Sequence, residues 1–215
     1  MYRFPILFFL FLSAACLNFS CGPYRHMQKI ESEESCVLKL KPDFSRVIYK
    51  TSVNVIGNHI SGLLLIKYMQ DSSTRIVFSN EMGFTFFDFG FETSNRFIVH
   101  QVIPQMNKKG LIKMLRKDFE LLLFRNMDST KAYSLAAGNL IYHAFPQSEG
   151  INYYITDLPC HQLIKMQIAS DKKPRMEALI YNNAPDNPPD SILIRHLNFF
   201  HLTISLKKII PLAPE

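Results

Sequence analysis

Short apolar runs, separated by polar turns at intervals of about ten to twelve residues, follow one another along most of the chain. The runs are rich in β-branched and aromatic residues, and Gly, Asn, Asp or Pro stand between them. This spacing is typical of antiparallel strands joined by short turns, and it predicts roughly ten to eleven strands. The predicted strands fall in residues 47–55, 59–69, 74–79, 84–91, 96–102, 133–145, 151–156, 162–169, 176–181 and 191–209. The run 133–145 contains a turn at Gly138-Asn139, and 191–209 is long enough for two short strands or one long bent strand.

Residues 107–124 interrupt this pattern. Their apolar side chains, among them Leu111, Leu115 and Phe119, recur at helical spacing, and four lysines and an arginine fall largely between them. Asn107 is a suitable N-cap for a helix that begins here. We predict an amphipathic helix with a basic exposed side. It either plugs one end of the sheet or serves as a lid or a membrane-surface contact.

The strand at 84–91 is apolar on both faces, which indicates that the sheet curls around something apolar. Alternation places Phe87 and Phe89 on one face, and Phe84 and Phe86 on the other with Asp88. A sheet of this length must curl, split into two or close. We therefore predict a mainly β fold: a curled antiparallel sheet or half-barrel of about 10–11 strands with a covering amphipathic helix. The candidate residues of a hydrophobic cavity and its lid are Phe84, Phe86, Phe87, Phe89, Leu111, Leu115 and Phe119.

The hydrophobic content and the net charge of the chain are consistent with a single apolar domain in an exported protein. Hydrophobic residues make up 47% of the 215, Phe occurs 18 times and Trp is absent. The net charge is +6. In an exported protein this charge suits anionic membrane head groups or acidic polymers better than nucleic acid, so we expect no nucleic-acid partner.

The first residues have the pattern of an export signal. Arg3 precedes an apolar run at 4–15, and two cysteines follow, Cys16 and Cys21, each after a small residue. A run of about a dozen residues is too short to span a bilayer as a helix. A cysteine at its end is typical of a bacterial lipoprotein signal, and an ordinary secretory signal is the alternative. We predict a lipoprotein signal peptide at 1–20, a tether at 21–35 and a single domain at 36–215.

Two cysteines compete as the site of lipid attachment. Cys16 follows two alanines and has the better local match, whereas Cys21 is followed by Gly22, which is typical of an anchor. If Cys21 carries the lipid, the mature chain keeps only Cys36 and Cys160, an even pair that suits an oxidising compartment. We therefore favour Cys21, with Cys16 as the alternative, and predict a disulfide between Cys36 and Cys160.

Motifs for catalysis and metal binding are weak. The chain has no H-E-x-x-H, G-x-S-x-G or C-x-x-C motif and no Gly-rich phosphate loop. His196 and His201 would face opposite sides of a strand, which argues against shared metal ligation. Asp88 lies among aromatic residues and is a candidate acid, but pairing with Arg75 on the neighbouring strand is the commoner arrangement. We predict that the protein is not an enzyme and uses no metal or cofactor.

Several short runs resemble a known family. They are Ile60-Ser61-Gly62 at the start of a strand, the turn Asp71-Ser72-Ser73, then Arg75-Ile76-Val77-Phe78, Met82-Gly83-Phe84 and the late pair Leu158-Pro159. Together, within 53–91 and at 158–159, they resemble the bacterial lipoprotein carrier and receptor proteins of the LolA/LolB type. The resemblance implies an eleven-stranded half-barrel, closed by helices, that holds acyl chains in an apolar cavity.

These observations lead to one main expectation. The protein is expected in the cell envelope, anchored by lipid and facing the periplasm, most readily on the outer membrane. There it would bind acyl chains, the lipid moiety of a lipoprotein or another hydrophobic ligand, in lipoprotein or lipid transfer. The alternative is a structural or assembly lipoprotein whose curved sheet binds a protein partner. An open apolar cavity supports the first, and a filled interior supports the second.

Overall fold

The computed structural model describes residues 23–24, 26–31, 35–55, 57–170, 172–181, 187–197 and 201–209. The predicted signal peptide, with the candidate lipid-attachment residues Cys16 and Cys21, lies outside them.

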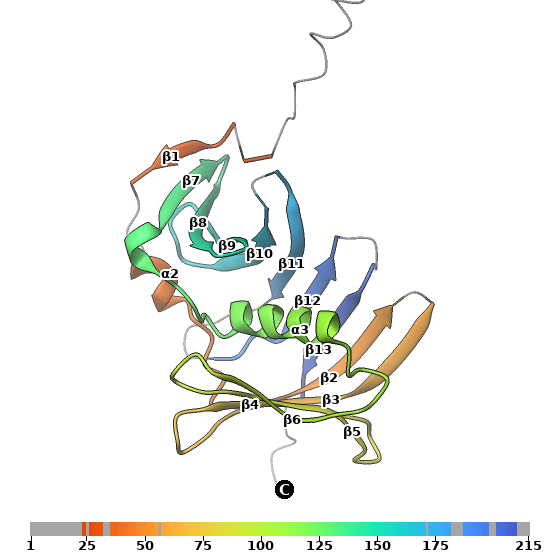
Figure 1. Ribbon diagram of the computed structural model, residues 1–215. Coiled ribbons are helices and arrows are strands. Elements are labelled where there is room, and N and C mark those ends of the chain that lie inside the picture. The colour runs from red at the N-terminus through yellow and green to blue at the C-terminus, as the bar shows by residue number, and fades with distance from the viewer. Residues whose placement is uncertain are drawn as a thin grey trace, which may run out of the picture.

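One antiparallel sheet of 13 strands forms the body of the protein, in the order β1-β7-β8-β9-β10-β11-β12-β13-β2-β3-β4-β5-β6. The sheet curls without closing within the described residues (Figure 1), so the mainly β, curled-sheet prediction is confirmed. The strands are β1 (Gln28–Ile30), β2 (Arg46–Val55), β3 (Asn58–Tyr68), β4 (Thr74–Ser79), β5 (Thr85–Phe91), β6 (Phe97–Val102), β7 (Tyr133–Ala137), β8 (Leu140–Gln147), β9 (Gly150–Asp157), β10 (Leu163–Ala169), β11 (Pro174–Tyr181), β12 (Ser191–His196) and β13 (Thr203–Lys208). The helices are α2 (Ser35–Lys39), α3 (Lys109–Leu122) and the 3-10 turn η2 (Ser129–Lys131).

The strand count exceeds the predicted ten to eleven. The runs at 133–145 and 191–209 each contain two paired strands, β7 and β8 in the first and β12 and β13 in the second. In addition, β1 lies in the segment 21–35, which the sequence predicts to be a tether. A strand of three residues is too short to show a period in the sequence, which is why β1 was missed.

Helix α3 carries the chain from one edge of the sheet back toward the other. It follows β6, an edge strand, and precedes β7, which lies next to the opposite edge strand β1. The helix makes this crossing over the concave side of the sheet, between the curl of β7–β11 and the strands β2–β6 (Figure 1). The predicted helix is therefore confirmed and covers the inner face.

The predicted N-cap of this helix is wrong. Lys108, in an extended conformation, stands at the N-cap position, and no side chain caps the helix. The backbone N–H of Asn107 instead donates to the carbonyl oxygen of Ile103 at 3.0 Å, in a turn that follows β6. Asn107 therefore belongs to the turn around Pro104, and the helix begins after it.

The segment read as a tether is partly packed on the sheet. The Tyr24 ring stacks on Tyr153 with centroids 4.7 Å apart, and its hydroxyl donates to Gln167 at 3.3 Å. Burial raises the pKa of Tyr24 well above its ordinary value. Further on, β1 pairs with β7. In its described parts, therefore, the segment 21–35 belongs to the domain.

A disulfide joins Cys36 in α2 to Cys160 in the turn between β9 and β10. Their Cα atoms are 6.2 Å apart, within the range that a disulfide spans without backbone movement. The bond links residues 124 positions apart and ties the start of the domain to the curl of β7–β11.

No helix among the described residues has the length and hydropathy needed to span a bilayer.

Candidate functional site: an apolar cavity beneath helix α3

A cavity of about 720 Å³ lies between helix α3 and the inner face of the sheet. Its floor comes from β2, β3, β4, β5, β12 and β13, and its roof from the helix and the turn before it. The lining is almost wholly apolar. The lining residues are Thr51, Val53, Val55, Asn58, Ile60, Leu64, Phe78, Phe87, Gln105, Met106, Lys108, Gly110, Leu111, Met114, Leu115, Phe119, Ile194, Leu202, Ile204 and Leu206.

Burial separates the interior of the cavity from its mouth. The exposed lining residues Asn58, Gln105, Lys108 and Gly110 come from the start of β3 and from the segment that leads into α3. All four are polar or lack a side chain. The cavity is therefore an apolar chamber with a polar mouth at the N-terminal end of α3, the usual form of a site for a hydrophobic ligand.

The size of the side chains under α3 explains where the cavity lies. Toward the C-terminal end of α3, aromatic rings border the cavity: the rings of Phe119 and Phe87, which both line it, lie 6.0 Å apart between centroids, and just past the helix Phe124 lies 4.4 Å from Tyr154. Apart from Phe78 and Phe87, the apolar part of the floor consists of valine, isoleucine and leucine, which are smaller than aromatic rings. Space is left between these aliphatic side chains and the helix.

Polar contacts hold the middle and the C-terminal half of α3 to the sheet. Asp118 is 1% exposed, and its Oδ2 lies 2.8 Å from Nε2 of His196 on β12. The hydroxyl of Tyr154 donates to the carbonyl oxygen of Leu121 at 3.2 Å. Burial raises the pKa of Asp118, and its Oδ1 has no hydrogen-bond partner among the described residues. Asp118 was not among the predicted site residues, although helical spacing places it on the apolar face, three residues after Leu115.

Four of the seven predicted cavity residues line the cavity: Phe87, Leu111, Leu115 and Phe119. Phe89 is buried beside Phe87, with ring centroids 4.4 Å apart, and does not line it. Phe84 is 56% exposed and also lies outside it. The structure thus gathers the helix residues and one strand phenylalanine into the site.

Phe86 departs from the predicted alternation. The register between β4 and β5 shifts after the pair Phe78–Phe87, so that Ser79 pairs with Thr85 and Phe86 is left between them. Its ring packs against Phe78 at 4.9 Å, beside the core. A β-bulge adds one residue and changes the facing of its neighbours, so simple alternation assigns Phe86 to the wrong face.

The floor of the cavity was not predicted from the sequence. Val53, Ile60, Ile194 and Ile204 read as ordinary core residues in separate strands. They form one surface because β13 pairs with β2, with Ile204 opposite Val53. No local sequence pattern predicts the pairing of β13 with β2.

Asp88 has the predicted partner. Arg75 Nε donates to Asp88 Oδ1 at 2.9 Å, and the two side chains form an ion pair across β4 and β5. This contact agrees with a structural role for Asp88.

Cys36, Cys160 and the buried His143 bring three possible metal-ligand atoms within 4.8 Å of one another. The two sulfurs are joined in the disulfide, so neither is the thiolate that binds metals. Burial lowers the pKa of His143 to about 4, so its ring is neutral at pH 7. Its Nδ1 lies 3.3 Å from Oγ of Ser134, and this contact fits a structural role.

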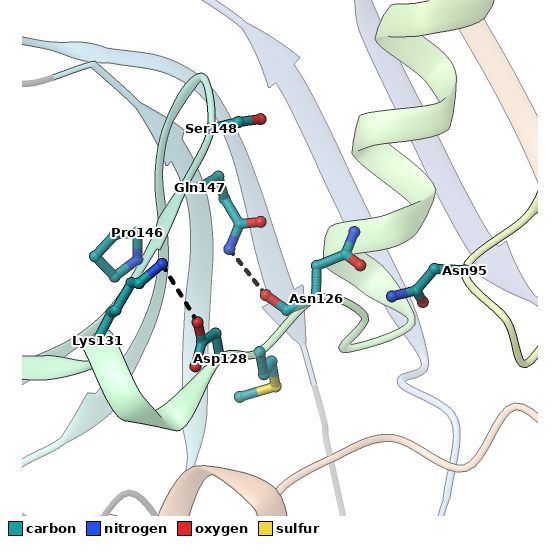
Figure 2. A pocket seen from close by; sticks show the side chains of 8 residues that line it. Asn95, Asn126, Asp128, Lys131, Pro146, Gln147 and Ser148 are labelled. Atoms are coloured by element: carbon teal, nitrogen blue, oxygen red, sulfur yellow. Dashed lines mark hydrogen bonds and ion pairs between the residues drawn. The ribbon is translucent and has the colours of Figure 1, made fainter.

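A second pocket, of about 790 Å³, is open and polar (Figure 2). It lies between the turn after β5, the segment after α3 and the end of β8. Polar groups in it already bind one another: Gln147 Nε2 donates to the Asn126 carbonyl oxygen at 2.9 Å, and Lys131 pairs with Asp128 at 3.8 Å. The apolar cavity is the stronger candidate for a ligand site. A ligand in the second pocket would compete with these existing polar contacts, whereas an apolar ligand in the cavity beneath α3 would bind by burial of apolar surface.

Comparisons with known proteins give structural neighbours only. Neither a family model nor a curated protein sequence matches the chain. The chain is similar to the crystal structure of the LolA superfamily protein NE2245 from Nitrosomonas europaea, with a TM-score of 0.46, 8% sequence identity and coverage of 86% of this chain and 96% of that one. It is also similar to a DUF1329 family protein from Desulfovibrio piger ATCC 29098, with a TM-score of 0.41, 7% identity and coverage of 83% and 92%.

Proposed function

We propose that this protein is a lipid-anchored lipoprotein of the cell envelope that binds an acyl chain, or a ligand of similar shape, in the cavity beneath α3. Transfer of lipids or of the lipid moiety of lipoproteins is the role we infer for this binding. The proposal includes no enzymatic step.

The open apolar cavity carries this proposal. A chain that enters it leaves water and contacts aliphatic and aromatic side chains, which stabilises binding by about 0.8 kcal/mol for each buried methylene group. The flexible side chains of Met106 and Met114 at the roof can adapt to chains of different length. The alternative, a structural lipoprotein with a filled interior, fits the curl of β7–β11 but does not account for the space under α3.

The lipid anchor is supported by the sequence, and the fold then limits how far the domain can lie from the membrane. If Cys21 carries the lipid, only Gly22 and Pro23 separate it from Tyr24, which is stacked on the sheet. Three residues span at most about 11 Å when fully extended. The domain would then sit close to the membrane surface, with the Tyr24 edge nearest to the anchor. Attachment at Cys16 would allow a longer reach.

Photocrosslinking tests the binding site in membranes that contain the full chain. The probe is a palmitic acid analogue with a photoreactive group in its tail and an alkyne for detection. We expect labelling of cavity peptides that excess palmitic acid suppresses. If excess palmitic acid suppresses no labelling of the cavity peptides, the proposed binding function is wrong.

A matched pair of variants places the label in the cavity. Val53 lines the cavity from β2, and the adjacent Ser52 does not. Val53→Phe should fill part of the empty space and lower labelling several-fold, whereas Ser52→Phe should leave it unchanged. Equal labelling of both variants would show that the probe binds elsewhere. Acyl attachment is tested separately, by labelling with a fatty-acid analogue, which should be lost in Cys21→Ala and kept in Cys16→Ala.

A further inference from the structure

The mouth of the cavity carries charge of one sign. Among the described residues that line the cavity, Lys108 is the only one with a charged side chain. It is exposed and stands directly before the first turn of α3. The amide side chains of Asn58 and Gln105 lie at the same mouth. A ligand whose tail enters the cavity would leave its polar end beside an ammonium group and two amides.

Lys108 differs from the basic residues further along the helix. Lys113 and Lys117 both bind Glu149, with N–O distances of 2.9 and 2.6 Å. Lys108 makes no ion pair with any residue that the structure describes. The first turn of α3 contains no acidic residue, so the partial positive charge of the helix N-terminus adds to that of Lys108.

We propose that the cavity selects amphiphiles with an anionic head group, a carboxylate or a phosphate, and that Lys108 is the residue that recognises the head. This inference rests on the proposed function and names its substrate class. The apolar tail supplies most of the affinity through burial. The head group stays in water at the mouth, where an anion meets Lys108, a neutral head gains no ion pair and a cationic head is repelled.

The volume of the cavity limits the size of this ligand. At about 720 Å³ it lies within the range of roughly 300–1,000 Å³ that is typical of small-molecule sites. One amphiphile fits such a space, and a folded protein segment does not. The polar part of a larger molecule would remain outside, beyond Lys108.

The test compares head groups on one tail, in membranes that contain the full chain. Three photoreactive probes share the same alkyl chain and end in a carboxylic acid, a phosphate monoester or a primary alcohol. Labelling by each acidic probe is expressed as a ratio to labelling by the alcohol, and each ratio is compared between variants. Partitioning of the probes into the membrane is the same for all variants, so the comparison isolates the contribution of the protein.

In Lys108→Gln we expect the ratios to fall about 1.5-fold to fivefold, the range of effect that one solvent-exposed ion pair gives. Lys108→Arg should keep them, and high salt should reduce them in the unmodified protein. Lys109→Gln is the matched control, because Lys109 is also exposed and adjacent but does not line the cavity. A higher ratio for the phosphate indicates a phospholipid source, and a higher ratio for the carboxylate a free fatty acid; both support the inference.

Two results would overturn the inference. One is an unchanged set of ratios in Lys108→Gln while the alcohol probe still labels the cavity. The other is an equal fall in Lys109→Gln, which would show a general effect of surface charge. Failure of all three probes to label the protein is a different outcome, because it removes the proposed function itself.

Discussion

The two halves of helix α3 meet the sheet in different ways. From Leu115 onward the inward side chains are buried, and this half includes the Asp118–His196 pair; Leu115 and Phe119 here also border the inner end of the cavity. Before Leu115 the residues Leu111 and Met114 are only half-buried, because they face a cavity. One amphipathic helix thus serves as a core element at one end and as a roof at the other. A plug of the sheet and a lid were the alternatives for this helix; its C-terminal end is core, whereas its N-terminal end, with Leu115 and Phe119, borders the cavity.

The largest effect on stability is expected at the buried polar pair. His196→Ala leaves the Asp118 carboxylate without its described partner in an apolar surrounding, and we expect a loss of about 3 to 5 kcal/mol in the free energy of unfolding. Pulse proteolysis of the full chain across a urea series measures this.

The pH dependence of His196→Ala identifies the cause. The pKa of Asp118 is raised by burial, so the folded state holds its proton more tightly than the unfolded state. Stability of the variant should therefore fall as pH rises above the ordinary range of an Asp carboxyl. The double variant Asp118→Leu/His196→Leu should recover much of the loss. A loss in His196→Ala that is independent of pH would point to packing instead of charge.

A pair of identical substitutions compares the two halves directly. Leu121 is fully buried and does not line the cavity, so Leu121→Ala should destabilise the protein by about 2 to 5 kcal/mol. Leu111 is half-buried at the cavity, and Leu111→Ala should cost less than about 1 kcal/mol while it lowers labelling by the palmitic acid probe. Equal losses of stability in the two variants would contradict the division of the helix into a core half and a roof half.

The smallest effect is expected at the ion pairs that join α3 to the turn between β8 and β9. Hydrogen bonds from Lys113 and Lys117 lower the pKa of Glu149 to about 2. A depressed pKa means that the contribution to stability is present at neutral pH and is lost as pH falls from the ordinary carboxyl range toward 2. All three side chains are partly exposed, so solvent screens them and the change in stability should be small.

The Glu149 titration itself is the sharper measurement. In Lys113→Gln/Lys117→Gln, NMR titration of the Glu149 carboxyl should show its pKa returning to near the ordinary value. An unchanged low pKa would mean that other groups set it, and that these contacts do not tie the helix to the turn.

The sequence by itself determined the class of the fold and the identity of the covering helix. The short β-rich run of β4 and the helical spacing in α3 depend only on near neighbours in the sequence. The disulfide partners were also predictable from the sequence. With Cys21 as the lipid anchor, only Cys36 and Cys160 remain to pair with each other, and this argument depends on the number of cysteines alone.

Only the tertiary structure decided where the site lies. The floor of the cavity depends on pairing of β13 with β2, a contact between residues more than 140 positions apart that no local period encodes. A bulge in the pairing of β4 with β5 moved Phe86 beside the core. Lys108 became the charged residue at the mouth because the turn around Pro104 occupies Asn107 and delays the start of the helix. Local periodicity governs which side chains are buried, whereas the space left between them depends on how distant segments pack.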